Sequence, residues 1–385
     1  MPCHNLFRAF ETSSEQKFII ISKRQQQHQQ PALRTMTDDD TASKPLVTIT
    51  GVTGYLGSQV CLSFLQDGSY RVRGTVRSLN SDKVNQLQDG LGDHNFSKLE
   101  LVEADLMNEE SLIKACQDST YIIHTASPFH FKGDCVTPAV QGTTAIMKAC
   151  TIHKNTIKRV VITSSCAAAL APAKEDQPPD GVPYDETYWS NPNRPEGLHD
   201  YMKSKTLAEK TAWDYQQKEV DSSFELVTIL PTFIVGPAPM MGDGGTSINW
   251  MKGILFNTNP NEIVPSTSRG FVDVRDVAVA HVKAIQIEKA ANQRFILYNE
   301  RVPQPTLYNW LSTEFNDKPE EYAINGGKQP IMVPTKLNPN GRSGGGDLVD
   351  NTKSKTILQI QYTPLQQTMI DFGKQLISSG RQLKA

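Results

Sequence analysis

The stretch from Thr50 to Gly57 most constrains what this chain can fold into. It reads Thr-Gly-Val-Thr-Gly-Tyr-Leu-Gly, follows a short apolar run at 46–50 and precedes a helix-like segment at 55–66. A strand, a glycine turn and a helix in this order can hold a dinucleotide, because its phosphates lie on the amide groups of a helix N-terminus. An ordinary strand-to-helix turn remains the alternative, since the glycine spacing differs from the commoner G-x-G-x-x-G. The cofactor contacts expected from this turn are Gly51, Thr53, Gly54, Tyr55, Leu56 and Gly57.

Each glycine of the turn has a separate expected role. Gly51 would allow the tight turn, and Gly54 would let the backbone approach the pyrophosphate. Gly57 would let the helix and the strand pack closely.

Strand and helix signals alternate from Leu46 onward. This alternation predicts an α/β fold, a Rossmann-type doubly wound parallel sheet with helices on both faces. The strand candidates are apolar and β-branched, as in Val160-Val161-Ile162, which is typical of strands buried on both faces. The expected strands are 46–50, 71–76, 98–103, 120–124, 158–164 and 224–230, and the expected helices are 55–66, 82–90, 109–117, 136–153 and 198–219.

Three regions of different composition suggest the domain organisation. Residues 1–44 hold a glutamine-rich patch and an acidic run, which predict a disordered extension, with Met36 as an alternative start. Residues 45–235 are expected to form the NADP-binding Rossmann domain. Residues 236–385 are expected to form mainly a smaller C-terminal substrate-binding lobe with returning sheet segments. There the segments look shorter, and the stretch 325–346 is rich in Gly and Pro.

Composition excludes several classes of partner. Lys and Arg number 39 against 41 Asp and Glu, so no basic excess suggests nucleic acid or a membrane surface. No apolar run approaches the roughly 18 residues of a membrane helix. The six cysteines and eight histidines form no metal-ligand spacing, so no metal is expected. Six scattered cysteines suit a reduced cytoplasmic protein, while organellar import through residues 1–44 stays open.

The end of the second expected strand bears on the choice of cofactor. Arg77 lies twenty residues after Gly57, where an acidic residue would bind the ribose hydroxyls of NAD. An arginine can instead pair with the 2′-phosphate of NADP, and Lys83 would add a second positive charge. Both could also be solvated surface charges. The sequence therefore favours NADPH.

Two further groups of residues suggest carbonyl chemistry. Tyr201 and Lys205 are four residues apart on an expected helix, so both lie on one face. An ammonium beside a phenol would lower the phenol pKa and make Tyr201 a usable proton donor, and Lys205 could also hold the nicotinamide ribose. The strand 160–164 ends in hydroxyls, and Ser165 there could hydrogen-bond a substrate carbonyl. A surface lysine beside a half-buried tyrosine is the structural alternative.

Together these pieces resemble the extended short-chain dehydrogenases/reductases over roughly residues 46–375. The chain looks most like the dihydroflavonol-4-reductase-like branch, and similar to its fungal methylglyoxal and aldehyde reductases. The motifs are Thr50-Gly51-x-x-Gly54-x-x-Gly57, Gly74-Thr75-Val76-Arg77, Ala104-Asp105-Leu106, His124-Thr125-Ala126-Ser127-Pro128, Thr163-Ser164-Ser165, Tyr201-x-x-x-Lys205-Thr206-Leu207-Ala208-Glu209, Pro231-Thr232-x-x-x-Gly236-Pro237, Phe271-Val272-Asp273-Val274-Arg275-Asp276-Val277-Ala278 and Asp350-Asn351-x-x-Ser354-Lys355.

The resemblance implies a role for each matching residue. Ser165, Tyr201 and Lys205 match the catalytic triad, and Arg77 and Lys83 match the 2′-phosphate contacts. Asp273 and Asp276 are expected to hold the structure together. The other implied cofactor contacts are Asp105 and Leu106 beside adenine, Thr125, Ala126 and Ser127 near the ribose and nicotinamide, and Pro231 beside the nicotinamide.

Departures from the family pattern limit the substrate. Plant flavonoid enzymes carry an asparagine after their T-S-S strand, and Leu170 falls near that position here, which argues against a flavonoid. The block around Tyr201 also lacks the N-W-Y-C-Y-G-K pattern of cinnamoyl-CoA reductases. The expected function is NADPH-dependent reduction of a small-molecule aldehyde or ketone, by a monomer or homodimer. The alternatives are an NAD-dependent enzyme of the 3β-hydroxysteroid dehydrogenase or sugar-nucleotide epimerase type, which Arg77 disfavours, and a non-catalytic dinucleotide-sensing regulator.

Overall fold

The structure is a computed structural model that describes residues 43–127, 134–218, 224–242, 245–256, 259, 261–316, 318, 321–324, 329–338 and 348–382. The expected disorder of residues 1–44 and the alternative start at Met36 concern residues outside this part of the chain, apart from Ser43 and Lys44. Most of the expected loop 325–346 also lies outside it.

A seven-stranded sheet, parallel throughout, forms the centre of the fold. Its order is β10-β6-β5-β4-β1-β2-β3, so the direction of winding reverses between β1 and β4. Six of its strands lie within two residues of the ranges expected from sequence. The strands are β1 (Leu46–Thr50), β2 (Arg71–Val76), β3 (Leu99–Glu103), β4 (Tyr121–His124), β5 (Arg159–Thr163), β6 (Glu225–Pro231) and β10 (Gln293–Leu297).

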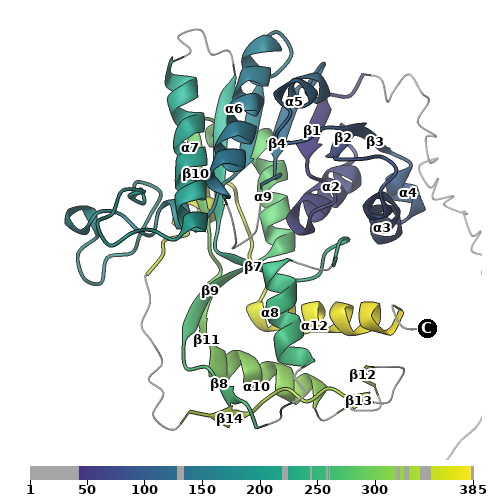
Figure 1. Ribbon diagram of the computed structural model, residues 1–385, viewed down its shortest axis with the longest axis vertical. Helices are drawn as coiled ribbons and strands as arrows, with labels where there is room; N and C mark the ends of the chain where they lie inside the picture. The colour runs from purple at the N-terminus through teal and green to yellow at the C-terminus, as the bar shows by residue number, and fades with distance from the viewer. Residues whose placement is uncertain are drawn as a thin grey trace, which may run out of the picture. The chain divides into compact units, whose positions relative to one another are not determined.

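Helices cover both faces of the sheet, as the apolar strands predict (Figure 1). Neighbouring residues of one strand enter different cores: Ile122 and Val160 pack with α5, α6 and α7, whereas Ile123 and Val161 pack with α2 and α9. The strands are therefore buried on both sides, which is the reason for their uninterrupted apolar runs. These helices are α2 (Tyr55–Asp67), α5 (Glu109–Ala115), α6 (Val136–Ile152), α7 (Asp200–Lys218) and α9 (Val274–Gln286), and the short α3 (Asp82–Leu91) and α4 (Asp93–Phe96) precede β3.

A smaller lobe lies below the sheet in Figure 1 and has its own core. Phe271, Phe315 and Phe372 are fully buried there, one from each of three different elements. The lobe contains α8 (Thr246–Leu255), α10 (Gln304–Phe315), α12 (Leu365–Gln382), the sheet of β7 (Phe233–Val235), β9 (Ser268–Asp273) and β11 (Glu300–Pro303), and the strand pairs β8 (Ile263–Val264) with β14 (Lys336–Leu337) and β12 (Ala323–Ile324) with β13 (Gln329–Pro330).

The expectation of shorter segments after Pro231 is wrong for two helices. Helix α9 has 13 residues and α12 has 18. The chain also returns to the main sheet there, because β10 pairs with β6 and α9 packs against α2. The remaining short elements are η1 (Cys166–Ala168), η2 (Lys174–Asp176), η3 (Glu288–Ala290) and α11 (Thr352–Thr356). Within the described residues, no helix is both long and apolar enough to cross a membrane.

Candidate active site

One cavity of about 1490 Å³ runs along the carboxyl ends of the parallel strands. Open α/β sheets bind ligands at this edge, next to the point where the strand order reverses. The cavity wall contains every site residue that the sequence suggests. These are Gly51, Thr53, Gly54, Tyr55, Leu56, Gly57, Arg77, Lys83, Asp105, Leu106, Thr125, Ala126, Ser127, Ser165, Tyr201, Lys205 and Pro231.

The glycine turn has the geometry that a phosphate cradle needs. Gly51 adopts φ +74°, a left-handed conformation that favours glycine, and its N–H donates to Thr75 Oγ1 at 3.1 Å. Helix α2 begins after Gly54, and among the described residues no side chain caps this end. Its first turn also contains no acidic residue. The free amide groups at this helix N-terminus therefore face the cavity and favour an anion.

Gly57 lies in the first turn of helix α2, where the helix comes close to the backbone of Gly51. A Cβ atom at this position would lie 2.2 Å from the Gly51 carbonyl oxygen and 2.8 Å from Thr125 Oγ1. We expect Gly57→Ala to push the helix away from the strand, lower the unfolding midpoint and weaken dinucleotide binding at least tenfold. Thermal unfolding and a fluorescence titration with NADPH measure both effects. Gly253→Ala, which meets no atom within 4 Å, is the control. Wild-type affinity in Gly57→Ala would contradict this account of the turn.

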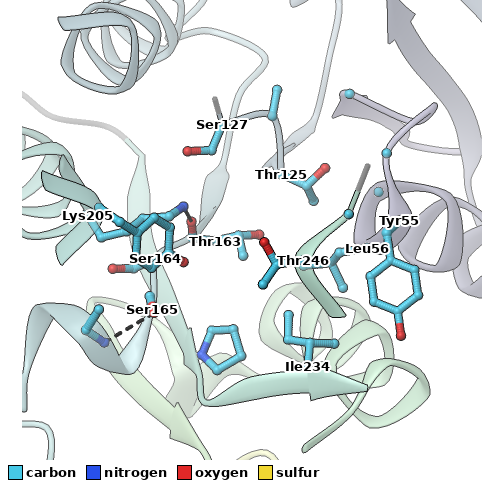
Figure 2. Close-up of a pocket in the computed structure, with 18 of the residues that line it drawn as sticks. Tyr55, Leu56, Thr125, Ser127, Thr163, Ser164, Ser165, Lys205, Ile234 and Thr246 are labelled. Carbon is cyan, nitrogen blue, oxygen red and sulfur yellow. Dashed lines mark hydrogen bonds between the residues drawn. The ribbon is translucent and has the colours of Figure 1, made fainter. Parts of the chain in front are cut away.

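Tyr55 lines the cavity, and its side chain also contacts the C-terminal lobe. Its hydroxyl donates to the Gly236 carbonyl at 2.6 Å, and its ring stacks on Phe372 with centroids 6.1 Å apart. In Figure 2 the Tyr55 ring lies at the right of the view, whereas Lys205 and Ser165 lie at the left. The Tyr55 side chain therefore joins α2 to the C-terminal lobe.

Two cations lie in the part of the cavity wall next to the carboxyl end of β2. Arg77 follows β2 and Lys83 lies in the first turn of α3, and both side chains are exposed. Within the described part of the chain, neither makes an ion pair or a hydrogen bond. Asp105 is already engaged, because its carboxylate accepts from the Met107 N–H at 2.8 Å. The arrangement leaves two positive charges available for an anionic group.

Ser165, Tyr201 and Lys205 come together at the other end of the cavity. Ser165 follows β5, and its Oγ accepts from the Ala167 N–H at 3.2 Å (Figure 2). Its side chain is also hydrogen-bonded to Tyr201, which lowers the Tyr201 pKa against the larger effect of burial. Tyr201 and Lys205 lie on one face of α7, as the four-residue spacing predicts.

The expected lowering of the Tyr201 pKa by Lys205 is wrong. Burial raises the pKa of Tyr201 to about 12, and Lys205 is not among the main contributors to this shift. The Lys205 ammonium instead donates to the Thr163 carbonyl oxygen at 3.2 Å. Burial lowers the pKa of Lys205 to about 8, so the ammonium and the phenol are both protonated at neutral pH.

Two buried histidines form hydrogen bonds with threonines at the carboxyl ends of β5 and β1, near the Ser-Tyr-Lys set. His281 donates from Nδ1 to the Val277 carbonyl at 2.8 Å, so its Nε2 accepts from Thr163 Oγ1, also at 2.8 Å. His124 pairs through Nδ1 with Thr50 Oγ1 at 2.9 Å. Burial lowers the pKa of His124 to about 3 and that of His281 to about 4, so both are neutral and structural.

The sequence reasoning did not single out the wall contributed by the C-terminal lobe. Phe233, Thr246, Arg269, Tyr298 and Arg301 all line the cavity, and the Arg269 guanidinium lies 4.4 Å from the centre of the Phe233 ring. No local motif marks them, because β7, β9 and β11 come together only by non-local pairing. Leu170 also lines the cavity and contributes an aliphatic group to its wall.

Among the described side chains, no group of three or more His, Cys, Asp or Glu residues is arranged to hold a metal ion. Cys61, Cys116, Cys135 and Cys150 are buried as free thiols, and Cys166 is partly exposed in the cavity wall.

Comparison with known proteins identifies the family. The sequence model described as the NAD dependent epimerase/dehydratase family matches residues 47–297. The ketoreductase azaE of Aspergillus niger is 30% identical, over 83% of this chain and 94% of that protein. The NADPH-dependent methylglyoxal reductase GRE2 of Saccharomyces cerevisiae is 28% identical, over 86% of this chain and 98% of that protein.

A solved structure extends the likeness to the whole fold. The structure of yeast methylglyoxal/isovaleraldehyde reductase Gre2 complexed with NADPH has a TM-score of 0.71 at 26% identity, and the match covers 88% of this chain and 100% of that one. The family match spans the strands and helices that carry the glycine turn, the two cations Arg77 and Lys83, and the Ser-Tyr-Lys set. The chain therefore belongs to the NAD-dependent epimerase/dehydratase family, the extended short-chain dehydrogenases/reductases.

Proposed function

We propose that this protein is an NADPH-dependent oxidoreductase that reduces an aldehyde or ketone carbonyl to an alcohol. The observation that carries the proposal is the order of groups along one cavity. A glycine cradle lies at β1, two free cations lie after β2, and Ser165, Tyr201 and Lys205 lie beyond β5. The names of the yeast and Aspergillus relatives, a methylglyoxal reductase and a ketoreductase, agree with this chemistry.

The residues present fit NADPH. The pyrophosphate would lie on the uncapped N-terminus of α2, and the 2′-phosphate would lie between Arg77 and Lys83. Asp105 and Leu106 would border the adenine, and Thr125, Ala126, Ser127 and Pro231 would border the ribose and nicotinamide. The bound cofactor supplies a hydride to the carbonyl carbon of the substrate.

The chain's own residues supply the proton and the orientation. Tyr201 keeps its proton at neutral pH because burial raises its pKa to about 12. The neutral phenol is the form that can give a proton to the carbonyl oxygen as negative charge develops there. Ser165 would hydrogen-bond the same oxygen, and the Lys205 ammonium would hold the nicotinamide ribose.

Arg77 provides a direct test of the choice of NADPH over NADH. A charged hydrogen bond to the 2′-phosphate contributes about 1.5–3 kcal/mol. We therefore expect Arg77→Ala to raise the KM for NADPH by about 10–100-fold and to leave NADH kinetics nearly unchanged. Steady-state kinetics with both cofactors measure the effect. The control is Arg71→Ala, which removes an exposed arginine at the opposite end of β2. Equal losses with both cofactors would contradict this role.

The proposed reaction is tested by initial rates of cofactor oxidation with purified protein. NADPH and NADH are each offered with small aldehydes, dicarbonyls and a dihydroflavonol. We expect turnover of at least one small carbonyl compound with NADPH and little turnover of the dihydroflavonol, since Leu170 lines the wall. NADPH binding without turnover of any carbonyl would favour the dinucleotide-sensing regulator.

A further inference from the structure

A buried carboxylate lies directly behind the catalytic groups. Glu209 is one helical turn after Lys205 on α7 and is 1% exposed. Its two oxygens accept hydrogen bonds from Ser164 Oγ at 2.6 Å, from Thr228 Oγ1 at 2.7 Å and from Arg294 Nε at 2.8 Å. An ionised group at this depth is tolerated only when it is paired and hydrogen-bonded, and Glu209 is both.

Arg294 on β10 forms an ion pair with this carboxylate. Its guanidinium stacks on the Trp189 ring at 3.6 Å and donates to the carbonyl oxygens of Glu186 and Tyr188. The stacking and the hydrogen bonds fix the guanidinium in place, so the carboxylate has one orientation. Glu209 thereby joins helix α7 to strands β6 and β10 at a single point.

The carboxylate is linked to two members of the catalytic set, to Ser165 through the preceding residue Ser164 and to Lys205 along helix α7. Ser164 directly precedes Ser165, and its N–H donates to the Ile229 carbonyl at 2.8 Å, while its hydroxyl is held by Glu209. Lys205 shares the helix face of Glu209, since residues four apart lie above one another. The Glu209 charge raises the pKa of Lys205 against the larger opposing effect of burial.

We propose that Glu209 is a positioning residue that fixes the strand end carrying Ser165 and places a buried negative charge one helical turn from the Lys205 ammonium. The proposal rests on the carbonyl reductase function proposed above. The other groups that face Lys205 do not replace this charge. His124 on β4 is neutral, Tyr201 on α7 stays protonated below about pH 12, and β5 presents only the Thr163 carbonyl. Arg294 on β10 is positive and paired with Glu209.

The direction of the pH effect follows from these charges. Lys205 has a pKa of about 8, so activity that needs its ammonium declines as the pH rises through about 8. Removing the Glu209 charge takes away the interaction that favours the ammonium. The pKa of Lys205 then falls further, and the alkaline decline moves to lower pH.

The test is the pH dependence of kcat with NADPH and the best carbonyl substrate from the panel, for wild type and Glu209→Gln. We expect the alkaline decline of Glu209→Gln to lie about one pH unit below that of wild type. Because Glu209→Gln leaves Arg294 buried without a negative partner, the variant Glu209→Gln/Arg294→Met is measured beside it. A smaller shift in the same direction is expected there, because the more distant positive charge of Arg294 is removed together with the carboxylate.

Two control variants separate charge from structure. Ser164→Ala should lower kcat without moving the alkaline decline, because the carboxylate charge remains. Thr228→Val removes one hydrogen bond to the carboxylate and should leave the decline in place. An unmoved decline in both Glu209 variants would overturn the proposal. If wild type binds NADPH but reduces no carbonyl, the proposed function fails instead, and the pH dependence of NADPH affinity in the same variants then decides the role of Glu209.

Discussion

Tyr201→Phe is expected to lower kcat by about 10²–10⁴-fold while NADPH affinity stays near that of wild type. The variant keeps the ring but loses the hydroxyl that, in the proposed reaction, gives its proton to the carbonyl oxygen. The pKa of about 12 makes this hydroxyl a proton donor throughout the neutral range. A loss in kcat without a loss in NADPH binding would mean that the hydroxyl acts in the chemical step.

The matched control lies on the same helix. Tyr215 is on α7, contacts Thr151 through its hydroxyl at 3.4 Å and does not line the cavity. Tyr215→Phe should keep kcat within about twofold of wild type, because it touches none of the reacting groups. Steady-state rates and a fluorescence titration with NADPH are measured for both variants. Wild-type kcat in Tyr201→Phe would exclude it as the proton donor.

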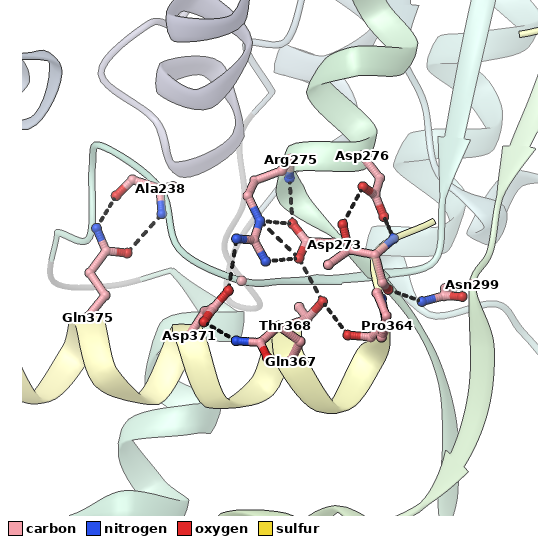
Figure 3. Close-up of polar contacts among 12 residues, drawn as sticks. Ala238, Asp273, Arg275, Asp276, Asn299, Pro364, Gln367, Thr368, Asp371 and Gln375 are labelled. Carbon is pink, nitrogen blue, oxygen red and sulfur yellow. Dashed lines mark hydrogen bonds and ion pairs between the residues drawn. The ribbon is translucent and has the colours of Figure 1, made fainter. Parts of the chain in front are cut away.

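The largest expected loss of stability outside the active site comes from Asp273→Ala (Figure 3). Asp273 is fully buried and caps helix α9 by accepting from the Arg275 N–H at 2.7 Å. It also accepts from the Arg275 guanidinium and from Thr368 Oγ1, each at 2.7 Å, which joins α9 to α12. Because the Arg275 side chain is 34% exposed and keeps its pair with Asp371, the loss is mainly that of the helix cap and of the hydrogen bonds to the buried carboxylate. We therefore expect a fall of about 2–4 kcal/mol in the free energy of unfolding.

An exposed ion pair supplies the comparison for Asp273. Lys148 Nζ lies 2.8 Å from Glu109 Oε2, and more than two-fifths of each side chain is exposed. Lys148→Ala should change the free energy of unfolding by at most about 1 kcal/mol, because solvent screens the pair. Urea unfolding followed by circular dichroism measures both variants. Equal effects would show that the Asp273 network contributes no more than a surface contact.

Asp273 and Asp276 were expected to be structural, and their contacts agree. Asp276 accepts from the Thr363 N–H and Oγ1, each at 2.8 Å, and so fixes the segment that leads into α12. Burial raises the pKa of Asp276 to about 6. Neither residue lines the cavity.

Local sequence signals predict the part of the molecule that contains the strands β1 to β6 and the helices between them. The strands β1, β4 and β5 and most of β6 are continuous apolar or β-branched runs, so they can be recognised one at a time. The glycine turn and the Tyr201–Lys205 spacing are likewise local patterns. These signals place the cofactor cavity and the Ser-Tyr-Lys set on one sheet edge without knowledge of side-chain packing.

Features that depend on distant partners could not be predicted in this way. Strand β10 carries Arg294, which interrupts the apolar pattern, and its compensating partner Glu209 lies 85 residues earlier. Arg269 and Arg301 enter the cavity wall only because β9 pairs with β11. The Tyr201 pKa was predicted in the wrong direction because burial, a property of the whole fold, outweighs the effect of the neighbouring lysine.

The most direct measurement of the central claim is hydride transfer itself. The purified protein is incubated with a reducible aldehyde or ketone and with NADPH that carries deuterium at the transferred position of nicotinamide C4. The proposed function predicts an alcohol one mass unit heavier than the unlabelled product, formed in the same amount as the NADP produced. Tyr201→Phe should form little of it. Oxidation of NADPH without label in an alcohol product, or no product from any carbonyl despite NADPH binding, would contradict carbonyl reduction by this chain.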